Sequence, residues 1–168
     1  MKWLSYFILA YLALGLQIAL TGFVEVKGAA PNFVLLVVVF LSLNTPREPA
    51  LLGCFLLGLM QDLLTLQPLG TWAVAYSLTA YFVLSTQEIV YPSHPLTHFS
   101  MTLAGGILCG VVLTTHAWLY AKLHGPLNAQ SKAVGVFGSA LYSAVLAPIL
   151  LGVLQRMKPT LGFRRSRN

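Results

Sequence analysis

Long apolar segments limit the possible folds of this 168-residue chain more than any other feature. A helix needs roughly 20 mostly apolar residues to cross about 30 Å of hydrocarbon, because it rises about 1.5 Å per residue. Five segments reach or approach that length: residues 3–24, 50–66, 70–90, 96–120 and 133–157. With 57% hydrophobic and 8% charged residues, the sequence predicts an integral membrane protein. The apolar run after Lys2 is longer than a signal peptide requires, so we predict an uncleaved first helix.

A sixth apolar segment, PNFVLLVVVFLSL at residues 31–43, is short. It crosses a membrane only if it begins near Gly28, tilts, or lies where protein replaces lipid. The alternative is a re-entrant hairpin over residues 31–66 whose tip, NTPREP, lies at membrane depth. That hairpin buries Arg47 and Glu48, at a cost of at least ~2.5 kcal/mol each. We therefore predict an all-α membrane protein in which residues 1–157 form one compact bundle of six transmembrane helices.

Basic residues in short loops predict the orientation of the bundle. With six spans and an inner N-terminus, seven basic residues lie inside and three outside. The inner set is Lys2, Arg47, Arg156, Lys158, Arg164, Arg165 and Arg167, and the outer set is Lys27, Lys122 and Lys132. We therefore predict that both termini are cytoplasmic and that residues 158–168 form a basic cytoplasmic tail. Arg164, Arg165 and Arg167 either contact anionic lipid or an acidic partner, or only anchor the topology.

The chain's single aspartate, Asp62, lies in the apolar stretch GLMQDLLTLQPLG. Carboxylates in membrane helices face a bundle interior or a wet cavity, where backbone amides or hydroxyls satisfy them. The nearest donors are the amides of residues 67–71 and the hydroxyl of Thr71. Gly58 shares a helix face with Asp62, so a second backbone can come close there. We predict that Asp62 clamps the turn that follows its helix, and a proton relay or a cation site stays open as the alternative.

Small residues four apart mark helix faces that another helix can approach closely. Gly15 and Ala19 form such a pair in the first segment, and Gly106 and Gly110 form one in the fifth. Each pair is either a contact inside the bundle or a docking face for a partner, and spacing does not separate the two. Pro148 is expected to kink the last helix.

Residues that catalyse reactions or bind metals form no recognisable pattern in this sequence. Cys54 and Cys109 lie in apolar segments without a CxxC spacing and are predicted to be buried hydrophobic residues. His94 and His98 flank a proline in an interfacial loop, and His116 is expected as a hydrogen-bonded core residue. No HExxH, P-loop or dinucleotide motif occurs. We predict a non-enzyme without metal or cofactor, and no nucleic-acid partner, since the net charge of +6 is not gathered on a soluble face.

The region around Asp62 resembles the rod shape-determining membrane protein MreD of bacteria. The resemblance covers residues 31–83 and is carried by PNFVLLVVVFLSL, ALLGCFLLGLMQDLLTLQPLG and TWAVAYSLTAYFV. Its motif residues are Gly53, Gly58, Asp62, Pro68 and Gly70. The resemblance implies that these are scaffold residues and not a catalytic site. It also implies a fold similar to the six-helix substrate-binding subunit of energy-coupling-factor vitamin transporters.

The resemblance further implies a non-catalytic inner-membrane subunit of the cell-elongation machinery. MreD-like proteins pair with MreC, a single-span protein, and through it join a glycosyltransferase and a transpeptidase that build peptidoglycan, alongside the MreB filament. The loop at residues 87–97 has no lysine or arginine, which leaves the basic tail as the candidate for a cytoplasmic acidic contact. The alternative function is a vitamin-binding transport subunit, whose pocket needs several convergent polar groups. The outer side offers few of them: Glu25, Asn32, Asp62, Gln67, Thr71, Asn128 and Gln130.

Overall fold

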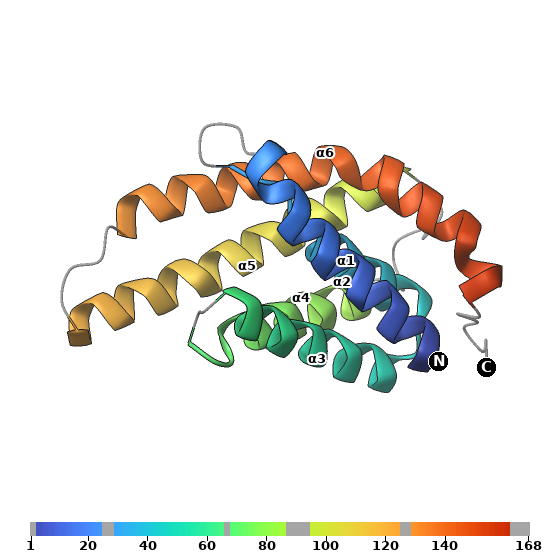
Figure 1. The fold of residues 1–168 in the computed structure, drawn as a ribbon, viewed down its shortest axis with the longest axis horizontal. Coiled ribbons are helices and arrows are strands. Elements are labelled where there is room, and N and C mark those ends of the chain that lie inside the picture. The colour runs from blue at the N-terminus through green and yellow to red at the C-terminus, as the bar shows by residue number, and fades with distance from the viewer. Residues whose placement is uncertain (1–2, 25–28, 66–67, 87–94, 125–128, 162–168) are drawn as a thin grey trace.

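The computed structural model describes residues 3–24, 29–65, 68–86, 95–124 and 129–161, and these form six α-helices. The helices are α1 (Trp3–Val24), α2 (Phe33–Asn44), α3 (Arg47–Thr65), α4 (Thr71–Thr86), α5 (Pro95–His124) and α6 (Ala129–Leu161). Helices α3 and α4 pack against each other, as do the longer α5 and α6. Helix α1 runs diagonally across the front of the bundle in Figure 1.

Helix α2 is the centre of the bundle. All 12 of its residues are buried, and it contacts each of the other five helices. A segment that is apolar on every side is stable only where apolar groups surround it completely, in a protein core or in lipid. At about 1.5 Å per residue, α2 is about 18 Å long, well short of a bilayer core. Protein surrounds this segment on every side, which is one of the conditions that the sequence set for a short crossing helix, and residue 28 lies outside the described residues.

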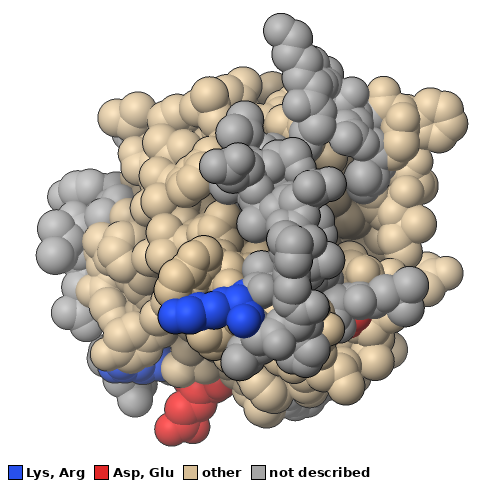
Figure 2. All heavy atoms as spheres, turned by 90° about the vertical axis from the view of Figure 1, so that its left-hand side faces the viewer, with Lys and Arg blue, Asp and Glu red and all other residues tan. Residues whose placement is uncertain are grey.

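Among the described residues, three helices have a stretch that is long and apolar enough to cross a membrane: Arg47–Thr65, Leu96–Tyr120 and Phe137–Met157. Shorter apolar stretches lie at Leu4–Leu20 and Phe33–Asn44. Large hydrophobic side chains are exposed on the outside of the bundle, as Phe23, Tyr11 and Leu4 are on α1. Few charged side chains appear on the described surface at the end of the molecule that Figure 2 shows. The exposed hydrophobic side chains along the sides of the helices are typical of a protein that lipid surrounds.

The ends of the helices fall on two sides of the bundle. The start of α1, the start of α3 and the end of α6 lie on one side, and the turn between α3 and α4 lies on the other (Figure 1). Helix α6 continues through Pro148 without interruption and is visibly bent. It ends at Leu161, so the boundary that the sequence suggested between residues 157 and 158 falls within a helix.

Candidate functional site

The side chain of Asp62 lies between α3 and the start of α4 and is 1% exposed. One carboxyl oxygen accepts from the amide of Trp72 at 2.9 Å, and the other accepts from the amides of Gly70 at 2.9 Å and Ala73 at 3.4 Å. The first amides of a helix have no partner within it, and a side chain just before the helix usually accepts from them. Gly70 holds that position before α4 and has no side chain. Asp62, supplied by the preceding helix, therefore caps α4.

The turn that Asp62 binds requires glycine at residue 70. Gly70 has a φ of +100°, which residues with a Cβ rarely adopt. The hydroxyl of Thr71, which the sequence suggested as a donor to Asp62, donates instead to the carbonyl of Pro68 at 2.9 Å. That expectation was wrong because a threonine hydroxyl near a turn bonds readily to a carbonyl of its own segment. Pro68 therefore enters the turn through its backbone oxygen.

Gly58 allows α4 to approach α3 one helical turn from Asp62. A Cβ at Gly58 would lie 2.4 Å from the Cα and 2.5 Å from the nitrogen of Ala73. These are backbone atoms and do not swing aside, so only glycine permits this packing. The carbonyl of Gly53, farther along α3, accepts from the hydroxyl of Tyr6 on α1 at 2.7 Å. The five motif residues thus share one local task, which is to hold α3 against its neighbours and against the turn.

A buried polar network joins this turn to the start of α2. The side chain of Asn32 caps α2 by accepting from the amide of Leu35 at 2.9 Å, and it donates to the hydroxyl of Tyr76 at 3.0 Å. That hydroxyl donates to the side-chain oxygen of Gln61, next to Asp62, at 2.8 Å. The network therefore connects α2, α3 and α4 through side chains that are satisfied by one another.

Two further helices hold the same end of α2. Gln17 on α1 accepts from the amide of Phe33 at 2.7 Å and donates to the carbonyl of Pro31 at 3.2 Å. The amide of Asn32 donates to the hydroxyl of Ser143 on α6 at 2.7 Å. Sequence reasoning missed Gln17, Gln61, Tyr76 and Ser143. The signal that could have found the first two is that each is a glutamine that follows a long run of apolar residues.

The two small-residue pairs have opposite surroundings. A Cβ at Gly106 would lie 2.6 Å from the Cβ of Ala140 on α6, and Gly110 is buried, so this pair packs inside the bundle. Gly15 and Ala19 are both exposed on α1, and no heavy atom lies within 4 Å of a Cβ built at Gly15. In the described structure the first pair is an internal contact and the second faces outward.

Candidate ligands for a metal do not gather in the described part of the chain. No group of three His, Cys, Asp or Glu residues is placed to hold a metal there. His98 is buried on α5, whereas His116 is half-buried beside the ring of Tyr120, so the core position expected for His116 was wrong. Arg164, Arg165 and Arg167 of the basic tail lie outside the described residues, as does His94.

Comparison with known proteins identifies the family. Residues 1–157 match the family described as rod shape-determining protein MreD. The chain belongs to the MreD family. The match extends well beyond residues 31–83, where the sequence motifs lie, and takes in α1, α5 and nearly all of α6. No curated protein and no solved structure matches the chain. Membership makes this a membrane protein that takes part in determining rod shape.

Proposed function

We propose that this MreD family member is a non-catalytic scaffold subunit of the cell-elongation complex in the inner membrane. Its core of α2, α3 and α4 is rigid, and its outer face on α1 binds the transmembrane helix of an MreC-like partner. Through that partner it supports the glycosyltransferase and the transpeptidase that build peptidoglycan, alongside the MreB filament. The observation that carries the proposal is the open position at Gly15 and Ala19, where a second helix can approach the backbone of α1 closely.

The hydrogen bonds of the polar groups in the core favour the scaffold function over a ligand-binding function. Asn32, Asp62 and Thr71 each bind a backbone or side-chain group of the bundle. These three are among the few polar residues of the outer side that could orient a ligand in a vitamin pocket. Glu25, Gln67 and Asn128 lie outside the described residues, and the side chain of Gln130 is not described. No specific observation favours the transport function.

The partner face is tested by co-purification of the two membrane proteins in detergent. We expect Gly15→Leu to release the MreC-like partner, because the added side chain fills the space that the partner backbone needs. Gly152→Leu on α6 is the matched control, since a Cβ at Gly152 also meets no heavy atom within 4 Å. If both variants retain the partner equally, the face on α1 does not bind it.

We also propose that six helices cross the inner membrane with both termini in the cytoplasm. The start of α1 and the end of α6 lie on the side where α3 begins, opposite the turn bound by Asp62, which supports an even number of crossings (Figure 1). Cysteine introduced at exposed Leu69, in that turn, should react with a membrane-impermeant thiol reagent added to spheroplasts. Cysteine at exposed Pro46, before α3, should react only after permeabilisation. The reverse pattern would overturn the orientation. The native Cys54 and Cys109 are buried and should not react with the reagent.

A further inference from the structure

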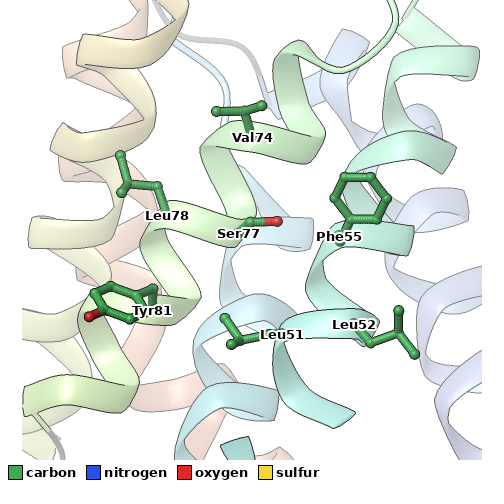
Figure 3. A pocket seen from close by; sticks show the side chains of 7 residues that line it. All are labelled: Leu51, Leu52, Phe55, Val74, Ser77, Leu78 and Tyr81. Atoms are coloured by element: carbon green, nitrogen blue, oxygen red, sulfur yellow. The ribbon is translucent and has the colours of Figure 1, made fainter. Parts of the chain in front are cut away.

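An apolar groove lies between α3 and α4 on the outside of the bundle. Its volume is about 600 Å³, and it is open along the outside of the bundle. Its lining residues are Leu51, Leu52 and Phe55 from α3 and Val74, Ser77, Leu78 and Tyr81 from α4. Figure 3 shows the hydroxyl of Ser77 pointing from α4 towards α3. Because that hydroxyl donates to the carbonyl of Ala73 at 2.7 Å, the groove presents hydrocarbon almost throughout to whatever occupies it.

Two opposite charges lie at one end of this groove. Arg47 is one helical turn before Leu51, and Glu48 is one turn before Leu52, so each charge continues a row of side chains that lines the groove. The guanidinium of Arg47 lies 5.3 Å from the centre of the ring of Tyr81, which is the last of the lining residues on α4. Both Arg47 and Glu48 are exposed. An occupant would therefore meet an apolar surface with a cation and an anion at one end.

The position of this charged end relative to a bilayer indicates what the occupant is. Helix α3 has 19 residues and is about 28 Å long, close to the thickness of about 30 Å of the hydrocarbon layer. A membrane-spanning α3 thus places its first two residues at the level of the lipid headgroups, with the groove open to acyl chains below them. The lining residues of α4 extend from Val74 to Tyr81, about 10 Å, which is less than two turns of a packed partner helix. The groove is therefore short for a helix and suited to a lipid.

We propose that this groove binds a phospholipid with an ethanolamine headgroup. An acyl chain lies along α3 and α4, the guanidinium of Arg47 binds the phosphate, and the carboxylate of Glu48 accepts from the ammonium group. A guanidinium offers paired N–H donors that match phosphate oxygens. The adjacent carboxylate repels a purely anionic headgroup and attracts a zwitterionic one. The site rests on the membrane location of the family and is independent of the partner face on α1.

Native mass spectrometry of the purified protein in detergent tests the proposal. Phosphatidylethanolamine, phosphatidylglycerol and phosphatidylcholine with identical acyl chains are added at equal concentration. We expect one tightly held phosphatidylethanolamine per chain. Arg47→Gln should weaken its binding about tenfold, the effect of losing one charge-assisted hydrogen bond, whereas Arg156→Gln, at another exposed arginine, should not. Glu48→Gln should remove the preference for phosphatidylethanolamine over phosphatidylglycerol.

Two groove-filling variants test the location of the lipid. Ser77→Phe occupies the groove from between the helices, and Val74→Trp narrows it from a position that is 56% exposed and should leave the fold intact. Both should lose the bound lipid while their unfolding temperatures stay near that of the parent protein. Retention of the lipid by both variants, stronger binding of phosphatidylglycerol by the parent protein, or unchanged binding in Arg47→Gln would overturn the proposal. If Val74→Trp releases the MreC-like partner and keeps the lipid, the groove is a protein interface and the proposal is wrong.

Discussion

The glycines Gly106 and Gly15 stand in the same sequence pattern, each with a small residue four positions later, yet the fold uses them in opposite ways. Gly106 packs against Ala140 inside the bundle, whereas Gly15 is open on α1. The pattern indicates only that a backbone can be approached. Which helix approaches it depends on the rest of the chain, and at Gly15 no described helix does. The comparison therefore separates positions that hold the bundle together from a position available to a partner.

The largest effect is expected at Gly58, where an added Cβ would meet the backbone of α4. Gly58→Ala places a Cβ within 2.6 Å of three backbone atoms of Trp72 and Ala73, so α3 and α4 must separate. That movement also lengthens the bonds from Asp62 to the start of α4. We expect a loss of at least ~3 kcal/mol in the free energy of unfolding, measured by SDS titration, which is the upper range for overpacking. A loss below that of Gly106→Ala would show that the two helices are not in firm contact.

Asp62→Ala should have the next largest effect, because it removes the cap of α4. The amides of Gly70, Trp72 and Ala73 lose their acceptor, and we expect a loss of about 2 kcal/mol, the upper end for a helix cap. Asp62→Asn keeps one acceptor oxygen and should lose about half as much. Equal stability of the alanine variant and the parent protein would contradict the cap. Binding of the partner should persist in folded Asp62→Asn, since Asp62 does not touch the face on α1.

Gly106→Ala tests the internal member of the glycine comparison. The new Cβ meets the Cβ of Ala140 at 2.6 Å and its Cα at 3.0 Å, so we expect a loss of about 1 kcal/mol by SDS titration. The double variant Gly106→Ala with Ala140→Gly removes the closest obstacle and should recover part of that loss. Without such recovery, the contact between α5 and α6 at this point is not what limits the substitution.

The sequence predicts most of the helices but not their neighbours. Hydropathy places α1, α3, α4, α5 and α6 to within a few residues, because lipid-crossing length and apolar composition are local properties. It does not show that α2 is buried by protein, since hydrocarbon and a protein core select the same residues. The bond between Asp62 and the turn could be predicted from the sequence because Gly70 is only eight residues away. The contact between Asn32 and Tyr76 could not be predicted, because those residues are 44 positions apart and meet only in the folded bundle.

Gly15→Ala, the external member of the comparison, should have the smallest effect and the opposite sign. Its Cβ meets no heavy atom within 4 Å, so nothing in the bundle opposes it. Alanine in a helix interior is more stable than glycine by roughly 0.5–1 kcal/mol, because glycine loses more backbone freedom on folding. We therefore expect a rise of about 0.5 kcal/mol in the free energy of unfolding of the isolated protein, by the same SDS titration.

The same Gly15→Ala substitution should weaken co-purification of the MreC-like partner, because the added methyl group lies where the two backbones meet. At a residue that only faces lipid, this change raises the stability of the protein and leaves partner binding unchanged. At a residue inside the bundle, it lowers both stability and partner binding. Higher stability together with weaker partner binding is therefore a combination that only an interface position produces. A fall in stability at Gly15 of the size expected at Gly106 would place both glycines inside the bundle, and the distinction between them would no longer hold.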